Sequence, residues 1–238
     1  MTPNRATTVP AVAIAGLFVT ALVTAQLTAS KVLAFSLPFS LPVVGDSLVL
    51  PGASLAIAVM FFASDVYTEL YGKRAAQVLV NVGFGLNFVL LALVWSTILA
   101  PAAPTGVDPA TYRTVLGAST NIVIGSLAAY IVSQNWDVLV FHSLREFTGG
   151  AHLWLRNIGS TATSQALDTV IFVTVGFYLA PTVLGIGSAI PVEVLVPLIA
   201  GQYLLKLAIA VVDTPFVYLL VGLARRGERA GPVVERAD

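Results

Sequence analysis

Six long apolar stretches follow one another along the chain, separated by short segments rich in proline and glycine. A bilayer core about 30 Å thick requires roughly 20 apolar residues in a helix that crosses it. Each stretch meets that length, and the ten-residue alternation typical of membrane β-strands is not seen. We therefore predict an all-α integral membrane protein, a bundle of six transmembrane helices over about 12–35, 52–71, 75–100, 115–141, 158–180 and 192–224.

Positively charged residues are concentrated in alternate connections between these spans. Three connections hold only Arg113, whereas the opposite side holds Arg5, Lys73, Arg74, Arg145, Arg156, Arg225, Arg226, Arg229 and Arg236. By the positive-inside rule, both termini are cytoplasmic. We expect a cytoplasmic segment over 1–11, a single six-helix domain over 12–224 and a polar cytoplasmic tail over 225–238. The stretch 182–192 is expected to form either a short extra helix or a re-entrant segment on the outside, or neither.

Composition excludes several other classes of protein. The 238 residues are 57% hydrophobic and 10% charged, whereas soluble domains carry roughly 25% charged residues. Twelve Lys and Arg balance twelve Asp and Glu, so the basic excess typical of a nucleic-acid-binding protein is absent. There is no cysteine, no HExxH sequence and no phosphate-binding loop, and there are two histidines. We expect no enzymatic activity, no catalytic residue, no metal and no cofactor.

Charged residues nevertheless occur inside the predicted spans, where each costs roughly 2.5–3.5 kcal/mol on insertion scales. They are Lys31, Asp65, Glu69, Asp137, Asp168, Lys206 and Asp213. Five spans carry polar stripes at helical spacing, which are Thr20/Thr24/Thr28/Lys31, Asp65/Glu69, Tyr130/Gln134/Asp137, Asn157/Thr161/Ser164/Asp168 and Gln202/Lys206/Asp213. The stripes predict one shared, partly hydrated cavity. Alternatively, Asp65 and Asp213 neutralise Lys31 and Lys206 in buried pairs, and hydroxyl and amide groups hold helices together.

Five short motifs carry a resemblance to a known family. They are ASDVYTELYGKR at 63–74, LWLRN at 153–157, Ser160-Thr161, Ser164-Gln165-x-x-Asp168-Thr169 and Asp213-Thr-Pro-x-x-Tyr218. Together they resemble the queuosine-precursor transporter family, also called the vitamin uptake transporter group, over about 27–223. The resemblance implies a multi-pass importer of the prokaryotic inner membrane. Its implied substrates are 7-deazaguanines such as 7-cyano-7-deazaguanine or its aminomethyl relative, used for tRNA modification.

A 7-deazaguanine presents N–H donors at N1 and at its 2-amino group, beside a carbonyl acceptor. We expect Asp168 or Glu69 to accept from the donors, Gln165, Asn157 or Lys206 to serve the carbonyl, and Trp154 or Tyr71 to stack on the base. The full set of predicted substrate-binding residues is Asp65, Glu69, Gln134, Asp137, Trp154, Asn157, Gln165, Asp168, Lys206 and Asp213.

The expected mechanism is alternating access, either facilitated or coupled to proton flow through a carboxylate at lipid depth. The expected partners are a small heterocyclic substrate and the lipid bilayer, and a homo-oligomer is compatible with the sequence. The alternative function is that of a substrate-binding membrane subunit of a larger complex, or of an intramembrane enzyme. The sequence leaves open which deazaguanine is preferred, which ion couples and whether an ATPase partner exists.

Overall fold

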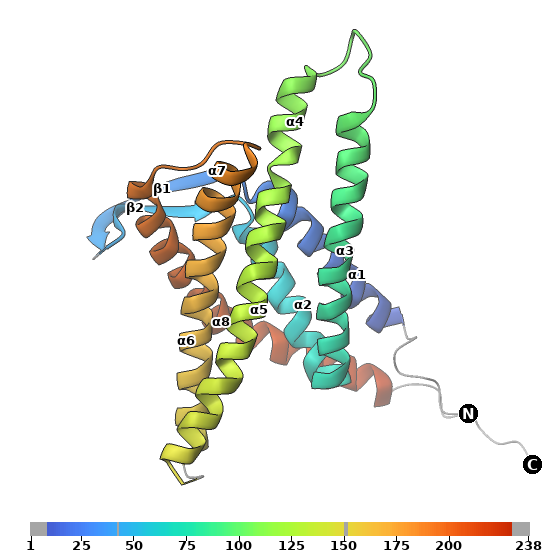
Figure 1. The fold of residues 1–238 in the computed structure, drawn as a ribbon. Helices are drawn as coiled ribbons and strands as arrows, with labels where there is room; N and C mark the ends of the chain where they lie inside the picture. Colours follow the sequence, from blue (N-terminus) through green and yellow to red (C-terminus); the bar gives the residue numbers. More distant parts are fainter. Residues whose placement is uncertain (1–8, 42, 150–151, 230–238) are drawn as a thin grey trace, which may run out of the picture.

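The computed structural model describes residues 9–41, 43–149 and 152–229, and their side chains except at 41, 153–157 and 224–229. Long helices pack side by side, and a small β-hairpin lies at one end of them (Figure 1). The helical elements are α1 (Val9–Thr28), α2 (Ser54–Tyr71), α3 (Lys73–Leu99), α4 (Pro109–Gly117), α5 (Ser119–Phe147), α6 (Leu153–Thr174), the π-helical segment η2 (Val175–Leu179), α7 (Ala180–Leu184) and α8 (Val192–Arg229).

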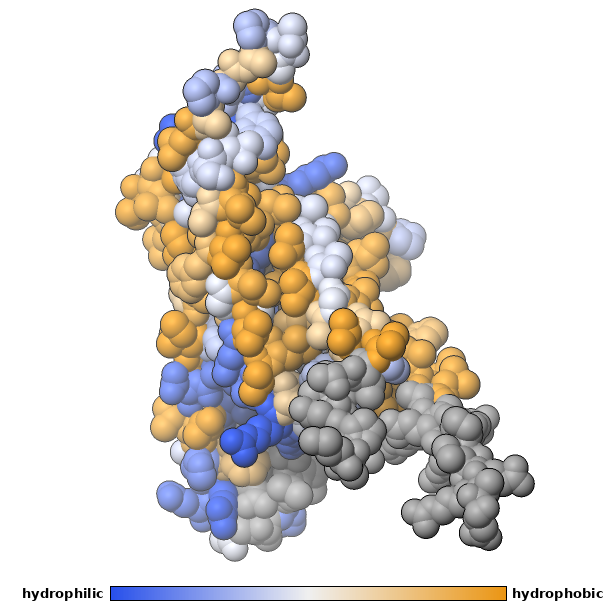
Figure 2. Space-filling model, turned by 90° about the vertical axis from the view of Figure 1, so that its right-hand side faces the viewer, coloured by the Kyte–Doolittle hydropathy of each residue, from blue (hydrophilic) through white to orange (hydrophobic). Residues whose placement is uncertain are grey.

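Five helical stretches among the described residues are long and apolar enough to cross a membrane. They are Val9–Thr28, Lys73–Leu99, Pro109–Phe147, Ile158–Leu184 and Val192–Leu223. The remaining predicted span corresponds to α2, which has 18 residues and carries Asp65 and Glu69. Figure 2 shows a broad apolar band on one face of the bundle, with hydrophilic residues gathered toward its lower end. The chain is therefore a helical, multi-pass membrane protein, as predicted.

The first predicted span is wrong at its C-terminal end. Helix α1 ends at Thr28, and the residues expected to complete it form β1 (Val32–Leu41), which pairs antiparallel with β2 (Gly45–Pro51). Proline cannot continue a helix interior, and Pro38 with the β-favouring residues before it explains the extended conformation. The hairpin packs on α8, where Gly201 has no Cβ that would meet the Val49 carbonyl oxygen.

Other boundaries differ from the predicted ones by several residues. The predicted fourth span is the middle of a longer helical stretch formed by α4 and α5. Asp108 caps α4 by accepting from the Thr111 backbone N–H at 2.8 Å, and this hydrogen bond lowers the pKa of Asp108. The connection expected over 142–156 is largely helical, since α5 ends at Phe147 and α6 begins at Leu153.

Helix also occurs in the stretch 182–192, in the expected C-terminal tail and in the expected N-terminal segment. Within 182–192, residues 182–184 are helical as the end of α7, 185–191 form a loop, and α8 begins at Val192. Helix α8 continues to Arg229, five residues into the expected polar tail. At the other end of the chain, α1 begins at Val9, inside the expected N-terminal segment.

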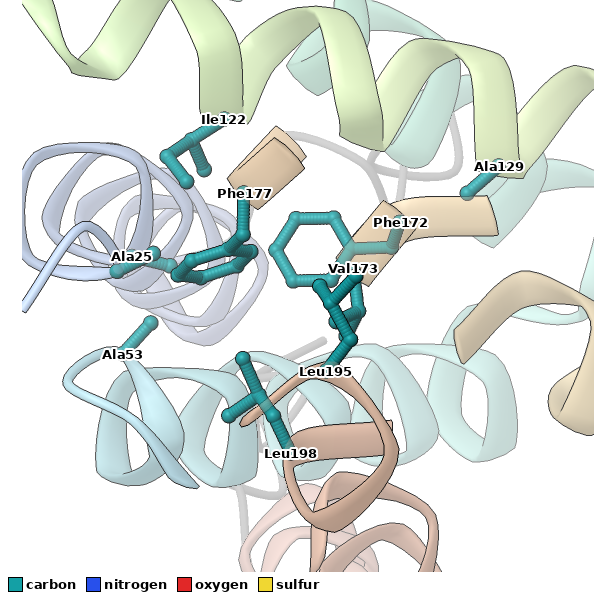
Figure 3. Packing of buried hydrophobic residues seen from close by; sticks show 10 residues of the cluster. Ala25, Ala53, Ile122, Ala129, Phe172, Val173, Phe177, Leu195 and Leu198 are labelled. Carbon is teal, nitrogen blue, oxygen red and sulfur yellow. The ribbon is translucent and has the colours of Figure 1, made fainter. Parts of the chain in front are cut away.

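The hydrophobic core lies where α5, α6, η2 and α8 meet. Phe172 and Phe177 contact each other edge to face, with ring centroids 5.7 Å apart, and Val173 and Leu198 are completely buried beside them (Figure 3). A Cβ on Gly125 of α5 would lie 2.8 Å from the Gly176 backbone nitrogen. This glycine contact brings α5 against η2 and fixes the position of α6 beside α5.

Candidate functional site

A cavity of about 250 Å³ lies in the middle of the bundle, between α1, α2, α3, α5, α6 and α8. We call it the central cavity. Much of its wall is apolar, and its polar lining residues are Gln26, Ser64, Ser126, Tyr130, Ser133, Gln134, Gln165, Asp168, Gln202 and Lys206. Drug-sized ligands occupy pockets of roughly 300–1,000 Å³, so this cavity suits a smaller molecule. The predicted cavity is therefore present in part, since residues from the stripes predicted on the fourth, fifth and sixth spans line it, whereas those of the first and second spans do not.

A partly buried ion pair forms one side of the central cavity. Lys206 Nζ on α8 lies 2.6 Å from Asp168 Oδ2 on α6, and Ser133 Oγ on α5 donates to Asp168 Oδ1 at 3.3 Å. The Lys206 side chain is 8% exposed and that of Asp168 is 26% exposed. Among the alternatives weighed from sequence, neutralisation of Lys206 does occur, but Asp168 rather than Asp213 is the partner.

Two glutamines that line the same cavity have buried amide oxygens without a hydrogen-bond partner among the described residues. Gln26 on α1 and Gln202 on α8 are each 3% exposed, and Oε1 of each has no hydrogen-bond partner among the described residues. A buried acceptor without a donor costs about 1–3 kcal/mol. Turned into the cavity, both oxygens would accept from the N–H groups of a ligand there.

The polar stripe predicted on α1 lies on the wrong face. Thr20, Thr24 and Thr28 are exposed, and the hydroxyls of Thr24 and Thr28 donate to the carbonyls four residues earlier, both at 2.8 Å. Lys31 is also exposed, in the turn after α1. Because these threonine hydroxyls bond their own helix, they can face lipid at little cost. Gln26 was missed, although it is the one amide in the apolar run of α1.

An aromatic pair completes the wall of the central cavity. The rings of Phe84 on α3 and Tyr130 on α5 stack with centroids 4.1 Å apart and an interplanar angle of 28°. The Tyr130 hydroxyl donates to Asn81 Oδ1 at 3.0 Å and accepts from Gln77 Nε2 at 2.8 Å. These bonds hold the phenol ring in place. Sequence reasoning placed Tyr130 on a polar stripe and did not assign it to stacking.

A second cavity of about 550 Å³ lies next to the first. Asp65 on α2 and Asp213 on α8 line it. The other polar lining residues are Thr161, Gln165, Tyr203 and Lys206, and the rest of the wall is apolar. Asp213 is 8% exposed, and its Oδ2 has no hydrogen-bond partner among the described residues. We call this space the second cavity.

The structure thus separates the predicted site residues into groups. Four line the central cavity, namely Gln134, Gln165, Asp168 and Lys206. Asp65 and Asp213 line the second cavity, together with Gln165 and Lys206, which contact both.

The other predicted site residues line neither cavity or have side chains that the structure does not describe. Asp137 accepts from Ser164 Oγ at 3.2 Å, and Glu69 is exposed on α2. Tyr71, the expected stacking residue on α2, packs against Tyr67 with ring centroids 4.6 Å apart. The side chains of Trp154 and Asn157, in the first turns of α6, lie outside the described part.

Fold and site together define a multi-pass helical membrane protein with a partly open central cavity, whose largely apolar wall carries several polar side chains. Residues 51–220 match the family described as "Putative vitamin uptake transporter". The chain belongs to this vitamin uptake transporter family.

Two curated relatives are similar to the chain. The "Probable queuosine precursor transporter" of Bacillus subtilis (strain 168) is 34% identical over 172 residues, which cover 72% of this chain and 71% of the relative. The protein of the same name from Haemophilus influenzae (strain ATCC 51907 / DSM 11121 / KW20 / Rd) is 26% identical over 125 residues, covering 52% and 51%. No solved structure matches the chain.

Proposed function

We propose that this chain imports a queuosine precursor of the 7-deazaguanine class across the inner membrane of a prokaryote. The observation that carries the proposal is the central cavity with its unpaired amide oxygens and its ion pair. A helix bundle gains no stability from unsatisfied polar groups at its centre, so their presence favours a ligand that satisfies them. Family membership and the names of both relatives support a transporter rather than an enzyme.

The chemistry of the cavity fits the hydrogen-bonding edge of a 7-deazaguanine. The amide oxygens of Gln26 and Gln202 accept from the N–H groups at N1 and at the 2-amino substituent. The Lys206 ammonium or the Gln165 amide donates to the base carbonyl, since both groups line the cavity. The stacked ring of Phe84 offers an apolar surface for the flat heterocycle.

This assignment changes the role proposed for Asp168. Its two oxygens already accept from Lys206 and Ser133, so we propose that Asp168 holds Lys206 in place rather than binding the base itself. Direct binding by Glu69, Asp137, Trp154 or Asn157 stays a prediction from sequence.

The proposal is tested in cells that cannot synthesise 7-deazaguanines and that lack their own importer. We expect the supplied precursor to appear as queuosine in tRNA when the chain is expressed, and not in cells carrying an empty vector. Supplying 7-cyano-7-deazaguanine and its aminomethyl relative separately identifies the preferred substrate. Absence of queuosine with either precursor, from a chain that is present in the membrane, would overturn the proposal.

We further propose alternating access as the mechanism, either facilitated or proton-coupled. Facilitated and proton-coupled transport are both compatible with the central cavity, and a proton uncoupler distinguishes them. If uptake collapses when the proton gradient is removed, a carboxylate at lipid depth couples proton and substrate movement. If the initial rate is unchanged, transport is facilitated and intracellular consumption of the base draws it inward.

A further inference from the structure

The central and second cavities share a wall. Phe61, Gln165 and Lys206 are the residues that line both. Lys206 is held in this wall by its 2.6 Å contact with Asp168. We refer to Phe61, Gln165, Lys206 and Asp168 as the partition.

The two cavities lie at different levels of the bundle. The central cavity reaches Ala29 and Ala53, next to the β-hairpin. The second cavity reaches Ile158 and Thr161, in the N-terminal half of α6, and α6 begins at the end of the bundle opposite the hairpin (Figure 1). A solute that moves along the bundle from one end toward the other therefore meets the partition between the two cavities.

Carboxylates lie on both sides of Lys206. On the central side, Asp168 binds it directly. On the other side, Asp213 lies seven residues later on the same helix, two turns along one face, and lines the second cavity with Asp65. Asp213 Oδ2 is buried without a hydrogen-bond partner among the described residues. Lys206 and this carboxylate line the same second cavity, separated by a helical rise of about 10.5 Å.

We propose that the partition is the gate of the transport path, and that the second cavity is a further station for the same substrate. In the closed state Lys206 pairs with Asp168. In the open state it turns to the acidic side of the second cavity, Phe61 moves aside and the two cavities join. Such an exchange of partners supplies the two discrete arrangements that a switching element needs. The inference rests on the proposed function for the identity of the solute, but the gate itself is testable without any solute.

The absence of cysteine from the chain makes accessibility measurements direct. Ser126→Cys places one thiol in the central cavity, and Ala210→Cys places one in the second cavity. A charged, membrane-impermeant methanethiosulfonate is added to the side of sealed vesicles at which α6 begins. Val211→Cys, whose native side chain is 74% exposed on the outer surface of α8, is the lipid-facing control and should not react.

The gate predicts fast reaction of Ala210→Cys and slow reaction of Ser126→Cys from that side. Asp168→Asn frees Lys206 from its partner, and should raise the rate at Ser126→Cys by about tenfold or more. Asp213→Asn makes the same chemical change on the other side of Lys206 and should leave that rate unchanged or lower it. Phe61→Ala removes the aromatic part of the partition and should also raise the reaction rate at Ser126→Cys.

The inference is overturned if Ser126→Cys already reacts as fast as Ala210→Cys from that side. It is also overturned if the two aspartate substitutions raise the rate equally, because Asp168 would then have no special role. Should the labelling follow the prediction while no deazaguanine is taken up, the gate stands and the proposed substrate is wrong.

Discussion

Within the part of the chain that the structure describes, Gln26 and Gln202 are the buried residues with an unpaired side-chain acceptor that line the central cavity. Each is buried in an apolar wall with its amide oxygen unpaired among the described residues, an arrangement that lowers stability in the absence of a ligand. Sequence patterns identified Gln202 only as part of a stripe and missed Gln26, because a lone glutamine on an apolar helix carries no periodicity. The unpaired oxygens become visible only when the helices are packed.

Replacing Gln202 with leucine should weaken substrate binding and at the same time stabilise the folded protein. We expect Gln202→Leu to raise the KM for uptake by about tenfold, since one hydrogen bond to the substrate is lost, and to raise the free energy of unfolding by about 1 kcal/mol. Uptake assays and thermal unfolding in detergent measure the two effects. Asn135→Leu is the matched control, because Asn135 is exposed and bonds its own helix. An unchanged KM for Gln202→Leu would exclude this residue from the binding site.

The ion pair between Lys206 and Asp168 makes a second prediction at this scale. Lys206→Met leaves the partly exposed Asp168 carboxylate without its cation and should lower the free energy of unfolding by about 2 kcal/mol, less than for a fully buried pair. Adding Asp168→Asn should restore most of that loss. Equilibrium unfolding of Lys206→Met, Asp168→Asn and the double variant gives the coupling energy, and a loss in the double variant equal to the sum of the two single losses would show that the pair is not coupled.

At the scale of elements, most helices follow from sequence and one segment does not. Runs of apolar residues with proline and glycine between them locate α2, α3, α5, α6 and α8 to within several residues. The hairpin of β1 and β2 was missed because its first strand continues the apolar run of α1 and reads equally well as helix. The antiparallel pairing of Val32–Ser36 with Ser47–Pro51 and the contact with α8 stabilise the extended conformation that Pro38 favours.

The approach of α5 to η2 depends on a glycine contact. Gly125→Ala would place its Cβ 2.8 Å from the Gly176 nitrogen and 3.0 Å from the Phe172 carbonyl oxygen. Because these are backbone atoms, the elements must move apart, and we expect a loss of about 1–3 kcal/mol in the free energy of unfolding. Gly85→Ala, with nothing within 4 Å of its Cβ, should be neutral or stabilising. Thermal unfolding that ranks the two variants in the opposite order would contradict this packing.

At the scale of the whole molecule, sequence predicted both the class of protein and the existence of a shared cavity. Stripes of polar residues on α5, α6 and α8 do converge, because side chains three or four positions apart share a helix face. The division into two cavities was not predictable, since it depends on how Phe61 and the ion pair of Lys206 are placed by the packing of α2 against α8. The cytoplasmic position of the termini and any homo-oligomer stay predictions.

The central claim is that this chain alone moves a 7-deazaguanine across a membrane. The most direct measurement is the entry of radiolabelled 7-cyano-7-deazaguanine, and separately of its aminomethyl relative, into liposomes that contain only the purified protein. We predict entry of at least one of them that saturates with concentration, exceeds entry into protein-free liposomes and is competed by the unlabelled base. Entry of both bases no faster than into protein-free liposomes, with correctly folded protein in the bilayer, would contradict the account.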